Sequence, residues 1–75
     1  MSGLLPAVSG EEAVRAFRKA GWIEDRQRGS HVILIKAGQP VSLSIPLHRE
    51  IAPGTLRALI RNAAMTVEEF VRCLP

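Results

Sequence analysis

The sequence predicts a protein of the α+β class, with one three-stranded antiparallel sheet that helices cover on one face. Helix-start signals occur at Ser9 and Thr66, near the two ends of the chain, and a β-branched run at 31–36 lies between them. The chain has 75 residues, of which 47% are hydrophobic. This length and composition fit a single small globular domain over residues 1–75 and exclude general disorder.

The first helix is expected over residues 10–20. Ser9-Gly10-Glu11-Glu12 has the form of a capping box, in which Ser9 and Glu12 satisfy each other's backbone amides. Gly21 is expected to end the helix in the left-handed conformation. The segment before the helix, residues 1–8, is expected to be flexible.

Three strands are expected to follow the first helix. Residues 22–27 form a short strand without clear alternation, and a Gly29-Ser30 turn leads into 31–36. Because residues 32–35 of this second run are continuously apolar, we expect a central strand with both faces at least partly covered. Apolar residues alternate with serines in 41–45, which predicts a third strand with one buried face, ended by Pro46.

Two helices are expected after the loop 47–54. The first opens at Pro53-Gly54 or Thr55, and its inward residues are Leu56, Leu59, Ile60 and Ala63. The second opens at the capping box Thr66-Val67-Glu68-Glu69, and its apolar residues are Val67, Phe70, Val71 and Leu74. The resulting order, α-β-β-β-α with a short extra C-terminal helix, is that of double-stranded-RNA-binding domains. Such an analogy does not by itself give a function.

Charge is distributed unevenly along the chain. The net charge is +3, but residues 13–62 hold nine Lys and Arg against three acidic residues. Small basic domains commonly bind nucleic acid, although a solubilising surface explains the same composition. No apolar run has the ~20 residues of a membrane span, and no signal peptide opens the sequence, so a cytoplasmic location is expected.

The content of metal-ligating residues does not predict a metal site. Cys73 is the only cysteine, which excludes an internal disulfide and a thiolate zinc site. His31 and His48 are the only histidines, and no carboxylates stand at a matching spacing.

His31 is the candidate catalytic residue. It opens the second strand, directly after Arg26, Arg28, Gly29 and Ser30. A histidine transfers protons near neutral pH, arginines bind phosphate, and a small turn lets a phosphate approach the backbone. These groups suit the cleavage of RNA through its 2′-hydroxyl. The alternative is a strand-end histidine whose ring satisfies a nearby backbone group, and the residues alone favour that alternative.

Further residues are candidates for RNA binding. The antiparallel hairpin places His48 at the same sheet edge as His31, where it either supports RNA binding and cleavage or caps Gly54-Thr55. Lys36 is expected to join Arg26 and Arg28 on the RNA backbone. Arg57 and Arg61, one helical turn apart, either extend a phosphate track or form a solvated face.

The chain resembles the HicA family of toxins from HicA–HicB toxin–antitoxin systems. The resemblance covers roughly residues 9–74 and rests on five segments in order. They are Lys19-Ala20-Gly21-Trp22, Arg26-Gln27-Arg28-Gly29-Ser30-His31, Ile45-Pro46-Leu47-His48, Pro53-Gly54-Thr55-Leu56-Arg57 and Thr66-Val67-Glu68-Glu69-Phe70.

This resemblance implies a fold like that of double-stranded-RNA-binding domains and a metal-independent mRNA interferase that inhibits translation and growth. It implies that His31 is catalytic, that no cofactor is needed, and that a HicB antitoxin covers His31. Relatives often place an aromatic residue just after this histidine, whereas this chain has Val32 and Ile33, which offer less for base stacking. A non-catalytic RNA-binding module of the same fold is the alternative function, and a protein-binding adaptor is a third.

Overall fold

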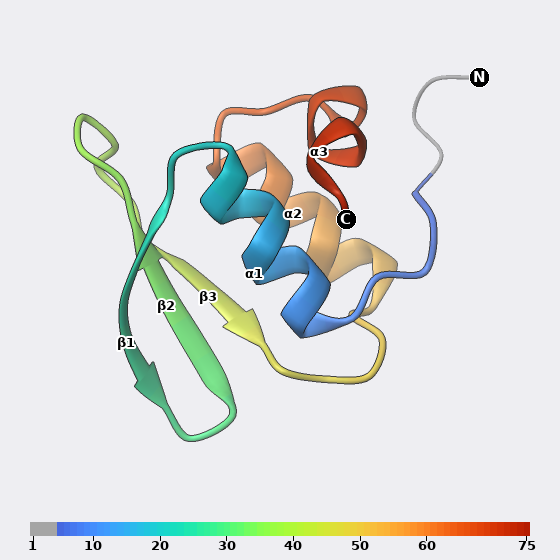
Figure 1. Cartoon of the computed structure of the whole chain (residues 1–75), viewed down its shortest axis with the longest axis horizontal. Coiled ribbons are helices and arrows are strands. Elements are labelled where there is room, and N and C mark those ends of the chain that lie inside the picture. The colour runs from blue at the N-terminus through green and yellow to red at the C-terminus, as the bar shows by residue number, and fades with distance from the viewer. Residues whose placement is uncertain (1–4) are drawn as a thin grey trace.

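A computed structural model describes residues 5–75 of the protein. Its helices and strands follow one another in the predicted order. Figure 1 shows the sheet on one side and the helices packed together on the other. The elements are α1 (Gly10–Lys19), β1 (Ile23–Arg28), β2 (His31–Ile35), β3 (Leu43–Pro46), α2 (Pro53–Asn62) and α3 (Val67–Cys73). The predicted α+β class and the antiparallel three-stranded sheet are confirmed.

The start of α1 is fixed by the predicted capping box. The Ser9 amide donates to the Glu12 carboxylate over 2.9 Å, and the Glu12 amide donates to the Ser9 hydroxyl over 3.1 Å. Half of the segment that was expected to be flexible, residues 1–4, lies outside the described residues. The expectation does not hold for Val8, which is 2% exposed and accepts a hydrogen bond from the Ile51 amide.

The sheet has the order β1-β2-β3, so β2 is central as predicted. Its two faces are covered unequally, and on the face turned away from the helices only Ile33 is half-buried. Val32 and Leu34 are buried under the helices, whereas His31 and Ile35 on the opposite face are exposed. We call this second face the open face of the sheet. The third strand begins at Leu43, later than predicted, and Val41 is 43% exposed.

A β-bulge at Asp25 changes which residues of β1 reach the open face. Glu24 pairs with Leu34, and Arg26 pairs with the next residue, Ile33, so Asp25 is the extra residue of the ladder. Side chains alternate between the faces of a strand, and a shift of one residue reverses the assignment of all that follow. Beyond the bulge, Arg26 and Arg28 therefore lie on the same face as Ile33 and His31.

The core lies between the sheet and the helices. All four inward residues predicted for α2 are buried, and the Phe17 and Phe70 rings pack with centroids 4.9 Å apart. The capping box of α3 forms as predicted between Thr66 and Glu69. Val71, expected on the apolar face of α3, is 36% exposed. The β1–β2 turn reaches beyond the helical layer, which leaves that end of the sheet accessible (Figure 1).

Candidate functional site

The candidate site is built on the β1–β2 turn. His31 is the first residue of β2, is exposed, and pairs directly with Arg28 of β1. Between them Gly29 has a positive φ of 58°, and Gln27 Nε2 donates to its carbonyl over 3.0 Å. The φ of Gly29 favours glycine at this turn position. The turn thus holds the imidazole and the Arg28 guanidinium on one face of the sheet.

The electrostatic environment of His31 is cationic. Arg26 lies one row further along the open face, and its side chain is 63% exposed. Its ion pair with Asp25 is long, at 3.9 Å, and such exposed pairs contribute little to stability. The guanidinium is therefore available to an anion.

The ring of His31 makes no hydrogen bond or ion pair with any residue in the range 5–75. The alternative to a catalytic role was that the His31 ring satisfies a nearby backbone group. That role would require a hydrogen bond between the ring and the backbone. The imidazole is instead exposed to solvent.

The loop after β3 is tied to this turn, so that His48 lies at the same end of the sheet as His31. The Leu47 amide donates to the Ser30 carbonyl over 2.7 Å, and the Gly10 amide donates to the His48 carbonyl over 2.9 Å. The alternative that His48 caps α2 is wrong, because the N-cap of α2 is Ala52 and no side chain caps it.

A hollow opens where this loop meets the start of α1. Its volume is about 390 Å³, and its lining residues are Ser9, Glu11, Leu47, His48 and Arg49. Of these, the sequence had indicated only His48 as a functional residue. Glu11 was assigned to the helix start, and no motif singled out Arg49. Their proximity to the turn follows from the packing of α1 against the end of β3.

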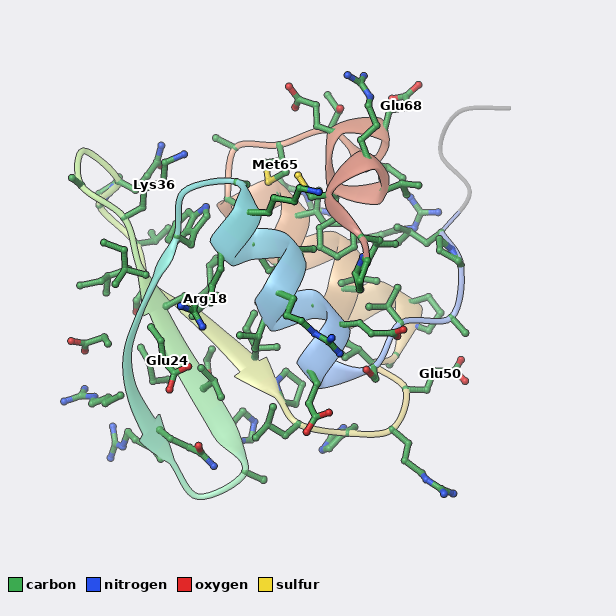
Figure 2. The ribbon with its side chains drawn as sticks, viewed as in Figure 1. Arg18, Glu24, Lys36, Glu50, Met65 and Glu68 are labelled. Carbon is green, nitrogen blue, oxygen red and sulfur yellow. The ribbon has the colours of Figure 1, made fainter. Side chains whose placement is uncertain are left out.

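The structure separates Lys36 from the other predicted site residues. Lys36 follows β2 at the end opposite to His31 (Figure 2), and its ammonium donates to the Ala20 carbonyl over 3.0 Å. The structure therefore does not bring Lys36 together with Arg26 and Arg28. A cation near the C-terminal carbonyls of α1 has a favourable electrostatic interaction with them.

Arg57 and Arg61 also lie apart from the turn. They line a second hollow of about 260 Å³ between α2 and α3, together with Ile60, Met65 and Val67. This hollow shares no lining residue with the first. The structure therefore places Arg57 and Arg61 at a hollow separate from the one beside the β1–β2 turn.

Two further features bear on function. Within residues 5–75, no three His, Cys, Asp or Glu side chains are grouped so that they could hold a metal ion. In the same part of the chain, no helix has the length and apolar character to cross a membrane.

Comparison with known proteins gives consistent results. The family model for the HicA toxin of bacterial toxin–antitoxin systems matches residues 10–65. A chain of the solved toxin–antitoxin complex from Streptococcus pneumoniae is 31% identical, with a TM-score of 0.67. That match covers 76% of this chain and 97% of the other. No curated protein gives a significant match. The family match spans most of the chain and includes the β1–β2 turn, α1 and α2. The chain therefore belongs to the HicA toxin family of bacterial toxin–antitoxin systems.

Proposed function

We propose that this protein is an endoribonuclease toxin that cleaves mRNA without a metal ion, with His31 as its catalytic residue. The observation that supports this most directly is the exposed imidazole of His31, which has no partner in residues 5–75 and lies opposite Arg28. A free imidazole beside fixed positive charge, in a chain of the HicA family, has the chemistry that RNA cleavage requires.

The reaction proceeds through the ribose 2′-hydroxyl. Its oxygen forms a bond to phosphorus while the bond from phosphorus to the 5′-oxygen of the next nucleotide breaks. The 2′-hydroxyl loses its proton to a base, and the 5′-oxygen gains one from an acid. His31 performs one of these transfers, and His48 assists. The products are a 2′,3′-cyclic phosphate and a 5′-hydroxyl.

The charged groups at the turn stabilise the phosphate as negative charge develops on it. Arg26 and Arg28 bind the RNA backbone from the open face. Gly29 and Ser30 shape the turn so that a phosphate can approach the backbone. A positioned general base contributes roughly 10²–10⁴-fold, which is enough for a slow nuclease whose role is to destroy messages.

The central experiment incubates the purified protein with RNA in EDTA, beside the His31→Ala variant. We expect cleavage by the wild type, 5′-hydroxyl ends, and loss of cleavage in a variant with an unchanged circular dichroism spectrum. A 5′-phosphate product, or full activity of His31→Ala, would contradict the proposal. Salt-dependent RNA binding without cleavage at any pH would instead indicate the non-catalytic RNA-binding module.

We further propose that the protein acts in the cytoplasm and that a HicB antitoxin neutralises it by covering His31. The S. pneumoniae relative is part of a toxin–antitoxin complex, and the imidazole here is accessible to a partner. Expression should arrest growth, His31→Ala should relieve the arrest, and co-expressed antitoxin should protect His31 from diethyl pyrocarbonate. An antitoxin that neutralises while His31 stays reactive would contradict this mode of inhibition.

A further inference from the structure

We propose that the hollow between the start of α1 and the β3–α2 loop binds the base of a nucleotide beside the cleaved phosphate, and that the Glu11 carboxylate selects guanine there. The lining residues are Ser9, Glu11, Leu47, His48 and Arg49. This inference rests on the proposed function, because it assigns a substrate subsite to the same RNA-cleaving site.

The hollow adjoins the catalytic turn through the backbone. His31 pairs with Pro46 across β2 and β3, and the next residue, Leu47, lines the hollow. Neighbouring strands lie ~5 Å apart, so the floor of the hollow begins about one strand spacing from the His31 backbone. The hydrogen bond from the Leu47 amide to the Ser30 carbonyl, 2.7 Å long, fixes this separation. The hollow and the first residue of β2 therefore share one end of the sheet, where a nucleotide flanking a phosphate bound at His31 can enter the hollow.

The walls of the hollow are held in place without using its charged side chains. The capping box uses Ser9 and Glu12, and the Gly10 amide binds the His48 carbonyl. No hydrogen bond or ion pair within residues 5–75 involves the Glu11 carboxylate or the Arg49 guanidinium. These two groups, and the exposed His48 ring, are free to meet a ligand in a volume of about 390 Å³.

The pattern of charge matches a nucleotide. A carboxylate accepts hydrogen bonds and cannot donate them, so Glu11 favours a base edge rich in donors. Guanine offers two adjacent donors, N1–H and N2–H, which a carboxylate can accept together, whereas uracil offers one N–H between two carbonyl oxygens. Arg49 and His48 can stack on the base or bind the adjoining phosphate, and Leu47 supplies an apolar contact. In an otherwise basic region, Glu11 is the group that distinguishes bases.

The first test measures binding without cleavage. The ¹⁵N-labelled full chain is titrated with 5′-GMP and, separately, with 5′-UMP, and amide shifts are followed by NMR. We expect shifts at Glu11, Leu47 and His48, and about tenfold tighter binding of GMP, because one bidentate contact gives this order of discrimination. Equal binding of the two nucleotides, or no shifts at these amides, would overturn the proposal.

Two variants assign the selectivity to one carboxylate. Glu11→Gln replaces one acceptor oxygen with a donor, and it should remove the difference between GMP and UMP. Glu50→Gln is the matched control, since Glu50 belongs to the neighbouring loop but points outward from it (Figure 2) and does not line the hollow. Glu50→Gln should retain the preference for GMP, and loss of that preference in both variants would contradict a specific role for Glu11.

The second test separates this inference from the proposed function. Cleavage of a random RNA pool should show guanine enriched next to the cut, and Glu11→Gln should flatten that enrichment. If the wild type binds GMP selectively in the NMR test but cuts no RNA, the nuclease proposal fails and the base site stands. If the wild type cuts RNA with no preference for guanine at either neighbour, the nuclease proposal stands and the base site is refuted.

Discussion

Arg28 and His31 are direct partners across β1 and β2, and their side chains share the face of the sheet that the helices leave open. The bulge at Asp25 produces this relationship, because it reverses the alternation of β1 before Arg26. In a regular ladder running on from Ile23, Arg28 would lie on the helix side. A local irregularity of the edge strand thus determines the charge around the candidate catalytic group.

Exchanging two neighbouring residues of β1 tests whether RNA cleavage depends on which face of the sheet carries the positive charge. Arg28→Gln should slow RNA cleavage and lower the steepness of the log–log salt dependence of RNA binding by about 0.7, the value for one lost phosphate contact on single strands. Gln27→Arg combined with Arg28→Gln restores the net charge but places it on the other face. This double variant should remain as slow as Arg28→Gln. Recovery of wild-type cleavage would show that only total charge matters.

Lys36 should contribute to stability and not to RNA cleavage. Its ammonium binds the Ala20 carbonyl at the end of α1, so Lys36→Ala should lower the free energy of unfolding by about 0.5–1 kcal/mol. The rate of RNA cleavage at a temperature where the variant is folded should not change. Lys19→Ala, in the last turn of α1, is the matched control for loss of one positive charge. A fall in RNA affinity specific to Lys36→Ala would contradict this assignment.

Gly10 allows α1 to pack closely against the end of β3. A Cβ atom at this position would clash with the Pro46 carbonyl oxygen and lie 2.6 Å from the Leu47 Cα atom. Gly10→Ala should therefore lower the free energy of unfolding by about 1–3 kcal/mol, as overpacking does. Gly54→Ala, whose Cβ would meet no atom within 4 Å, should not destabilise the protein. Urea denaturation of both variants measures the difference.

The capping box of α3 should make stability depend on pH in the acid range. The hydrogen bonds that Glu69 accepts from the Thr66 backbone amide and from its hydroxyl lower the pKa of Glu69 below the usual 4.5. Because the folded pKa is the lower one, the stabilisation is present above pH 4.5 and is lost as the pH falls through the folded pKa. Glu69→Gln should reduce the acid-induced fall in melting temperature, whereas Glu68→Gln, with no capping bond, should leave it as in the wild type. If both variants show the same acid-induced fall in melting temperature, the capping box is not the source of the pH dependence.

Replacing Ala64 with glycine should increase the stability of the protein. It has a φ of 59° after α2, and the Ala64 and Met65 amides close the turn on the Arg61 and Ile60 carbonyls. An L-residue in this conformation costs about 1 kcal/mol, which glycine avoids. Ala64→Gly should raise the melting temperature by roughly 4–8 °C for a domain of this size. Ala63→Gly, at an ordinary helical φ, should lower it.

Local signals in the sequence predicted most of the fold. Both capping boxes, at Ser9 and at Thr66, form between residues three apart, so their outcome depends on little beyond the segment itself. The apolar periodicity of α2 identified its buried face for the same reason. The predicted start of β3 was less accurate. Val41 is typical of a strand, but the pairing of β3 with β2 ends at Leu43 and Leu34, so Val41 has no partner residue in β2.

The sequence by itself determined the order of the elements, the starts of α1 and α3 and the position of His31 at the start of a strand, because each depends on residues a few positions apart. Only the tertiary structure decided which side chains surround His31. The bulge turned Arg26 and Arg28 toward it, the packing of α1 brought Glu11 and the loop at His48 to the same end, and the end of α1 engaged Lys36 elsewhere. Strand register and helix packing depend on contacts between segments that are distant in the chain. The hydrophobic periodicity of a single segment therefore cannot predict them.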